Sequence, residues 1–113
     1  MAEENANEKR RALLHVQMDV PAEHEAELND WYWNEHLPER LAVPGFLSGR
    51  RFEAADGVSP KYLAVYDLED LSVLESPEYR ALVNPPDPHT KAIGRMLNTN
   101  LRRVYVEMPR PGA

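Results

Sequence analysis

The amino-acid sequence predicts an α+β fold of the ferredoxin-like type, with a four-stranded antiparallel sheet and helices on one of its faces. Four segments have the alternation or composition of strands, and helical segments separate the first strand from the second and the third from the fourth. This gives the order β-α-β-β-α-β, from which the sheet topology follows. The length of 113 residues suits one domain with a single core.

The first strand and the first helix are predicted from alternation and from proline. Apolar and polar side chains alternate over residues 13–20, and His15 falls on the polar face of that strand. Pro21 begins a helix, because proline suits a first helical position. Pro38 ends this helix at about Leu37, since proline lacks an N–H and clashes with the preceding turn.

The later elements follow from turn and capping signals. A turn at 43–45 precedes the second strand, and a break at 56–60 precedes the third. Asp70 caps a short turn, and Ser76 and Asp87, each followed by proline, are typical N-caps of helices. The predicted elements are strands at 46–53, 61–68 and 101–108, a turn at 71–75, and helices at 77–83 and 88–97.

Composition bounds the class of protein. We expect residues 1–10 to be a disordered polar leader, residues 11–108 the domain and residues 109–113 a flexible tail. With no cysteine, disulfides, thiolate zinc sites and a cysteine nucleophile are excluded. No segment has the apolar length of a membrane helix or signal peptide, so a cytoplasmic protein is expected, without a membrane partner.

The formal net charge is -6, and the acidic excess lies in the first 45 residues. A nucleic-acid partner is therefore not expected, because such binding depends on neutralising phosphates with Lys and Arg. The strands are apolar enough on both faces that the face without helices needs a cover. We expect a second copy of the chain to supply it, which predicts a homodimer.

The densest group of chemically active residues lies at 31–40 in the first helix. At 100° per residue, Trp31, Tyr32, Glu35 and His36 share one stripe that faces the core. The helix dipole and Glu35 raise the proton affinity of His36, whereas burial beside aromatic rings lowers it. The balance predicts a histidine that titrates near neutral pH, as a general base or acid requires. The alternative is a C-cap that binds the last helical carbonyls.

Two further histidines are weaker candidates for a ligand site. His89 lies in the first turn of a helix, where the positive end of the dipole favours neutral imidazole, and its alternative is a surface position. His15 lies mid-strand, where a hydrogen-bonded sheet histidine is the alternative. Trp33 and Leu37 fall on the side of the first helix that faces away from this stripe.

Adjacent arginines occur at 50–51 and 102–103 on two predicted strands. Adjacent strand residues face opposite ways, so each pair sends one guanidinium to each face of the sheet. An inward arginine beside Tyr105 or Phe52 is predicted to hold a carboxylate or phenolate, and Arg103 is the one predicted to contact the substrate. The alternative is a salt bridge to the acidic helix or across the dimer.

No metal site is expected. No two histidines are spaced three or four residues apart, and the adjacent Glu35 and His36 cannot converge on one ion from a regular helix. The serines lie in no nucleophile-elbow sequence, and no glycine-rich phosphate loop occurs. These absences leave proton transfer as the expected chemistry.

A resemblance to a known family rests on Trp31-Tyr32, on residues 35–38 (Glu-His-Leu-Pro) and on residues 43–46 (Val-Pro-Gly-Phe). Together with Tyr62-Leu63-Ala64-Val65-Tyr66, these segments resemble the EthD-like branch of the dimeric α/β-barrel superfamily. The resemblance implies a homodimer whose sheets pack face to face, with a small-molecule pocket in each subunit. His36 matches the helix-one histidine of the family, and Trp31, Tyr32 and Glu35 match the neighbours of that histidine.

These observations predict a cofactor-independent enzyme of the decarboxylase, cyclase or lyase type that acts on an aromatic or polyketide-like compound. His36 would transfer the proton, Glu35 would orient it, and an arginine would hold an anionic oxygen in a mildly cationic cavity. The alternatives are a non-catalytic dimeric module that binds a small ligand, and haem binding through one histidine. The residues predicted to contact the substrate are Trp31, Tyr32, Arg40, His15, Tyr66, His89, Arg103 and Tyr105.

Overall fold

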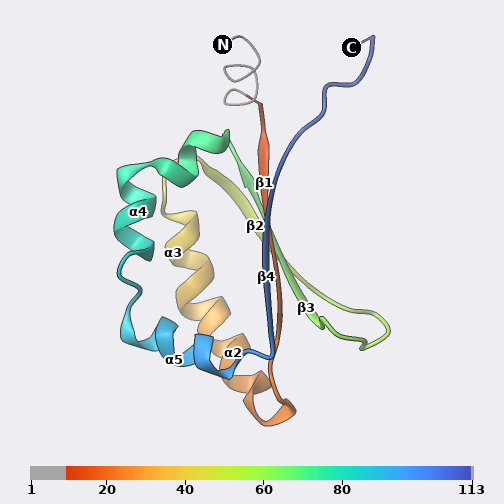
Figure 1. The fold of residues 1–113 in the computed structure, drawn as a ribbon, viewed down its shortest axis with the longest axis vertical. Helices are drawn as coiled ribbons and strands as arrows, with labels where there is room; N and C mark the ends of the chain where they lie inside the picture. The colour runs from red at the N-terminus through yellow and green to blue at the C-terminus, as the bar shows by residue number, and fades with distance from the viewer. Residues whose placement is uncertain (1–9, 113) are drawn as a thin grey trace.

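A computed structural model describes residues 10–112, so residues 1–9 of the predicted leader and Ala113 of the predicted tail lie outside the described residues. The sheet contains β1 (Ala12–Asp19), β2 (Phe46–Glu53), β3 (Tyr62–Leu68) and β4 (Thr99–Val106) in the order β2-β3-β1-β4. All neighbouring strands run antiparallel. The predicted ferredoxin-like α+β fold is confirmed, and the helices lie together on one side of the sheet (Figure 1).

The connections between strands are helical where the sequence predicts them. Ser76 and Asp87 cap their helices by accepting a hydrogen bond from a backbone N–H three residues on, and Asp70 caps its turn. The elements are η1 (Ala22–His24), α2 (Glu25–Trp31), η2 (Tyr32–His36), α3 (Leu37–Leu41), η3 (Leu71–Glu75), α4 (Pro77–Val83) and α5 (Pro88–Met96). Each of these helices is too short to span a lipid bilayer.

The predicted end of the first helix at Leu37 is wrong, because the helical backbone runs on to Leu41. The segment η2 is a π-helical turn in which the N–H of Leu37 donates to the carbonyl of Tyr32, five residues back. Pro38 therefore stands in the first turn of α3, where a missing N–H costs little. Pro21 precedes η1 as its N-cap and is not helical.

The π-helical turn also changes which side chains face the sheet. It places one extra residue in a turn, so the positions after it rotate relative to a regular α-helix. Leu37, expected on the far side, is buried, and its Cδ1 lies close to the backbone of Gly49 on β2. Trp33 is 52% exposed, as predicted.

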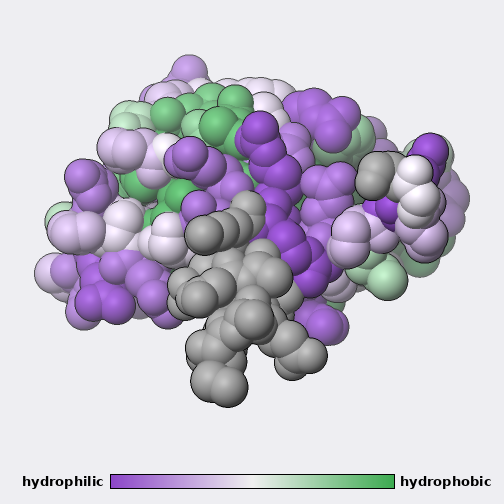
Figure 2. All heavy atoms as spheres, turned by 90° about the horizontal axis from the view of Figure 1, so that it is seen from above, coloured by the Kyte–Doolittle hydropathy of each residue, from purple (hydrophilic) through white to green (hydrophobic). Residues whose placement is uncertain are grey.

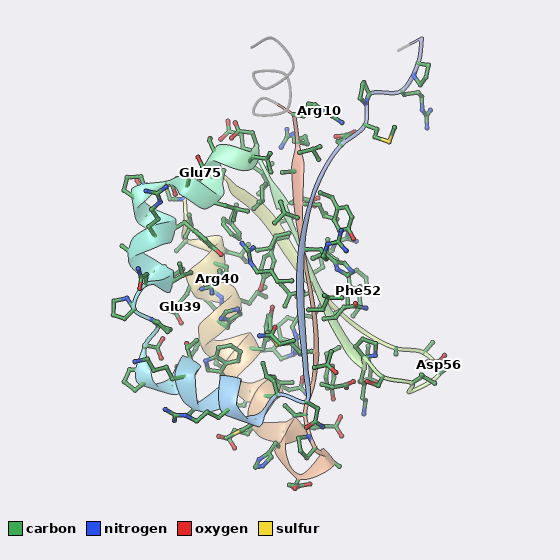
Figure 3. All side chains as sticks on the ribbon, in the orientation of Figure 1. Arg10, Glu39, Arg40, Phe52, Asp56 and Glu75 are labelled. Atoms are coloured by element: carbon green, nitrogen blue, oxygen red, sulfur yellow. The ribbon has the colours of Figure 1, made fainter. Side chains whose placement is uncertain are left out.

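The two faces of the sheet differ in cover. The helix-facing side chains of β1 and β3 are buried, among them Leu14, Val16 and Tyr66. The opposite face, here called the open face, carries the alternate positions, including His15, Val65 and Tyr105. Phe52 also lies on this open side, away from the helices (Figure 3).

Both termini of the described chain lie at the same end of the molecule (Figure 1). Viewed from that end, hydrophilic side chains surround a smaller hydrophobic area on the surface (Figure 2). The other end holds α2 and α5, near the ends of the strands (Figure 1). At this end, Glu25 and Asn29 of α2 form hydrogen bonds with the hydroxyl of Tyr62 at the start of β3.

Candidate functional site

A cavity of about 240 Å³ lies between the helices and the sheet. Its floor is apolar and comes from β1, through Leu14, Val16 and Met18. Its walls come from the continuous helical region α2-η2-α3, from α4 and α5, and from β3 and β4, so segments that are far apart in sequence converge on it. Among the predicted site residues, the cavity brings together Trp31, His36, Arg40 and Tyr66.

His36 occupies the wall between the first helix and the cavity and is only 8% exposed. Its imidazole stacks on the indole of Trp31, with ring centroids 4.3 Å apart and planes 29° apart. The ring of Tyr32 meets it edge-on at 4.8 Å. Two aromatic neighbours therefore fix the orientation of the imidazole.

The prediction that His36 titrates near neutral pH is wrong. Burial lowers its pKa from 6.5 to about 3, and the nearby charge of Arg40 adds to this effect. The favourable contribution expected from a helix C-terminus is absent, because the helix continues to Leu41. His36 is thus a neutral imidazole at neutral pH.

Glu35 does not orient His36. Its side chain lies away from the cavity, and Oε2 of Glu35 is 2.7 Å from Nδ1 of His89 on α5. Both partners are about two-fifths exposed, so the pair links η2 to the first turn of α5 at the surface. His89 approaches the cavity only through the edge of Trp31, at 6.5 Å between ring centroids.

Two guanidinium groups supply the charge of the cavity. Arg40 of α3 lines it, lying among the helices (Figure 3), with Cζ 5.9 Å from the ring centroid of Tyr79. Arg102 of β4 lines it from the sheet side, and its Nη2 donates to Oη of Tyr79 at 3.3 Å. No carboxylate lies among the described lining residues, so the predicted cationic character is present.

Arg102, and not Arg103, is the arginine that reaches the cavity. The two alternate across β4, and Arg103 pairs with His15 on the open face, where its Cζ lies 5.5 Å from the Tyr105 ring. Tyr105 meets the ring of His15 there at 6.0 Å. His15, Arg103 and Tyr105 therefore form a group of their own on the opposite side of the sheet.

The indole N–H of Trp31 has no hydrogen-bond partner within residues 10–112. Trp31 is 3% exposed, and its Nε1 is buried. Leaving such a group unpaired costs about 1–3 kcal/mol.

Tyr66 lines the cavity and is joined to Tyr32 behind it. Their hydroxyls are 2.7 Å apart and buried. Burial raises the pKa of both phenols, so both stay protonated. Tyr32 thus supports the wall without lining it.

Sequence reasoning missed Tyr79, and it named the two arginine pairs without selecting Arg51 or Arg102. Arg51 lies over the ring of Tyr32 at 4.4 Å and lines a second hollow of about 280 Å³ with the exposed Trp33. Because adjacent strand residues face opposite sides of the sheet, one arginine of each pair must face the helices, but the sequence does not indicate which one.

No group of three potential ligands for a metal ion occurs within residues 10–112.

Neither a protein-family model nor a curated protein sequence matches the chain. Solved structures of low identity share its fold. A mutant of SnoaB, a cofactor-independent oxygenase from Streptomyces nogalater, is 15% identical with a TM-score of 0.64, over 92% of this chain and 99% of its own. HapK from Hahella chejuensis is 14% identical with a TM-score of 0.59, over 91% and 97%.

A protein of Deinococcus radiodurans, whose name proposes an antibiotic biosynthesis monooxygenase, is 14% identical with a TM-score of 0.66, over 90% of this chain and 97% of its own. Identities this low show the fold and not the activity. The likeness shows the shared fold, and membership of the EthD-like branch of the dimeric α/β-barrel superfamily stays a prediction. The chain has the ferredoxin-like fold that these proteins share.

Proposed function

We propose that the cavity binds a phenolic aromatic compound and that His36 accepts its phenolic proton in an oxygenation that uses no cofactor. One observation carries the proposal: a buried neutral imidazole faces a cavity whose charged lining residues are two arginines. Trp31 and His36 offer flat rings against which an aromatic ring packs. The guanidinium groups of Arg40 and Arg102 offer hydrogen-bond donors to its oxygens.

The pKa of His36 rises when an anion forms beside it in the cavity. Proton transfer from the ligand to His36 creates a phenolate beside an imidazolium, and each charge stabilises the other. Arg40 and Arg102 stabilise the phenolate further. Protonation of His36 is therefore more favourable with a phenolate beside it than without one.

Oxygenation follows if the phenolate is conjugated to an activated methylene carbon. That carbon loses its two hydrogens and forms a carbonyl with one atom of O₂, while the other atom leaves as water. We favour this reaction over decarboxylation or cyclisation because a structural neighbour is a cofactor-independent oxygenase. Proton transfer by His36 contributes about 10²–10⁴-fold to its rate.

The test is O₂ consumption by the purified protein with a panel of phenols that carry an activated methylene group. We expect one O₂ consumed per carbonyl formed, and a loss of at least about 10²-fold in kcat/KM for His36→Ala. His24→Ala, which changes a partly exposed histidine at the start of the same helical region, is the matched control.

Turnover without O₂ consumption would contradict an oxygenase and would favour the decarboxylase, cyclase or lyase predicted from the sequence. Binding of phenols without any product would favour the non-catalytic module. Absence of both binding and turnover across the panel would reject the proposed function.

A further inference from the structure

Gly94 differs from its neighbours on the cavity-facing side of α5. Thr90, Ile93, Gly94 and Leu97 all line the cavity, and they fall within about 100° of one another around the helix. Three of them present side chains to it. Gly94 alone presents none, and it is exposed to solvent at the edge of this stripe.

Neither the backbone nor the packing requires a glycine at this position. Gly94 is not among the glycines with positive φ, and a Cβ built on it meets no heavy atom within 4 Å. Glycine weakens a helix relative to alanine. Glycine at this position therefore does not stabilise the fold. A side chain here would occupy free space at the rim of the cavity.

The volume of the cavity limits how much of a ligand it can enclose. An engineered apolar cavity of about 150 Å³ holds one benzene ring, and pockets for larger ligands are about 300–1,000 Å³. A cavity of about 240 Å³ thus holds one substituted ring, and a larger ligand must project through an opening. Gly94 lies at such an opening, beside the apolar side chain of Leu97.

We infer that Gly94 forms the mouth of the cavity and that the natural ligand is an extended aromatic compound. Its phenolic ring lies beside Trp31 and His36, and an apolar extension leaves the cavity past Gly94. This inference rests on the proposed function for the position of the ring. Gly94 is then a determinant of ligand length.

Two probes with the same phenolic acid group test it: salicylate, which is one ring, and 5-phenylsalicylate, which carries a second. Their dissociation constants are measured by calorimetry for the wild type, Gly94→Ala and Gly94→Leu. Lys91→Leu adds the same side chain at an exposed position of α5 that does not line the cavity, and serves as the matched control.

We expect the wild type and Lys91→Leu to bind both probes. Gly94→Leu should weaken 5-phenylsalicylate by about tenfold or more and leave salicylate within about twofold. Gly94→Ala should show a smaller loss in the same direction while its Tm rises by about 2–5 °C, because alanine favours the helix. The alanine variant keeps the test decisive should the leucine variant fold poorly.

Equal affinity of Gly94→Leu and the wild type for the longer probe would overturn the inference. An equal loss of both probes by a folded Gly94→Leu would also overturn it, because the position would then touch the ring and not an extension. If the wild type bound neither probe nor any phenol of the panel, the proposed function itself would fail.

Discussion

His36 is the one histidine of the chain whose ring is buried against the cavity. His15, His24 and His89 are partly exposed, and the last two face carboxylates. The same residue type therefore lies in different surroundings at four positions. Protonation of His36 places a positive charge in a largely apolar cavity that already contains two arginines.

This burial predicts an acid sensitivity of folding. The pKa of His36 is about 3 in the folded chain and 6.5 as an ordinary histidine, so the unfolded state binds more protons between these values. The stabilising contribution is fully present above pH 6.5 and decreases as the pH falls toward 3. We expect the wild type to lose on the order of 2–3 kcal/mol more than His36→Gln between about pH 7 and pH 4.

The measurement is the free energy of unfolding in urea at several pH values, for the wild type, His36→Gln and the partly exposed control His24→Gln. Subtracting the curves removes the shared titration of the carboxylates. The control should follow the wild type. Parallel curves for the wild type and His36→Gln would contradict a buried neutral His36.

The conformation of the turn before β2 requires a glycine at position 45. Gly45 has φ +96°, and a Cβ on it would lie 2.3 Å from Cγ2 of Val73 in η3. Its carbonyl accepts a hydrogen bond from the N–H of Glu69 at 2.8 Å, which joins the turn to the end of β3. Gly57, in the loop between β2 and β3, has φ +71° but no atom within 4 Å of a Cβ.

The two glycines therefore make a matched pair. We expect Gly57→Ala to cost about 1 kcal/mol from its backbone conformation alone, and Gly45→Ala to cost about 3 kcal/mol or more, because steric overlap with Val73 is added. Urea unfolding of both variants measures the difference. Equal losses would mean that η3 does not pack on this turn as described.

At the scale of the molecule, the open face of the sheet lacks a cover within the described chain. It holds Leu63 and Val65, the exposed Phe52, Leu101 and Tyr105, and the buried, unpaired Nδ1 of His15. It also carries both Arg50 and Asp67, so two copies related by a two-fold axis can place opposite charges together. We propose that a second copy of the chain covers this face.

This proposal predicts a dimer in solution, measured by size-exclusion chromatography with light scattering. Val65→Glu places a charge in the middle of the open face and should give a monomer, since a buried unpaired carboxylate is costly. Lys91→Glu changes the charge on exposed α5 and should remain a dimer. A monomeric wild type, or a dimeric Val65→Glu, would contradict the proposal.

The strands, the caps and the fold follow from local patterns. Alternation identified β1, and Ser76 and Asp87 marked the starts of α4 and α5, because these signals act within a few residues of one another. The π-helical turn was missed, since the regular period of 100° per residue contains no information about an inserted residue. Leu37 was misplaced and the end of the helix was set too early for that reason.

The sequence by itself determined the ferredoxin-like order and the candidacy of Trp31, His36, Arg40 and Tyr66. Only the tertiary structure decided that Arg102 and not Arg103 faces the cavity, and that Glu35 pairs with His89, which lies far from it along the chain. It also decided that His36 is neutral. Burial and long-range pairing depend on which surfaces meet in three dimensions, and periodicity along the chain does not contain that information.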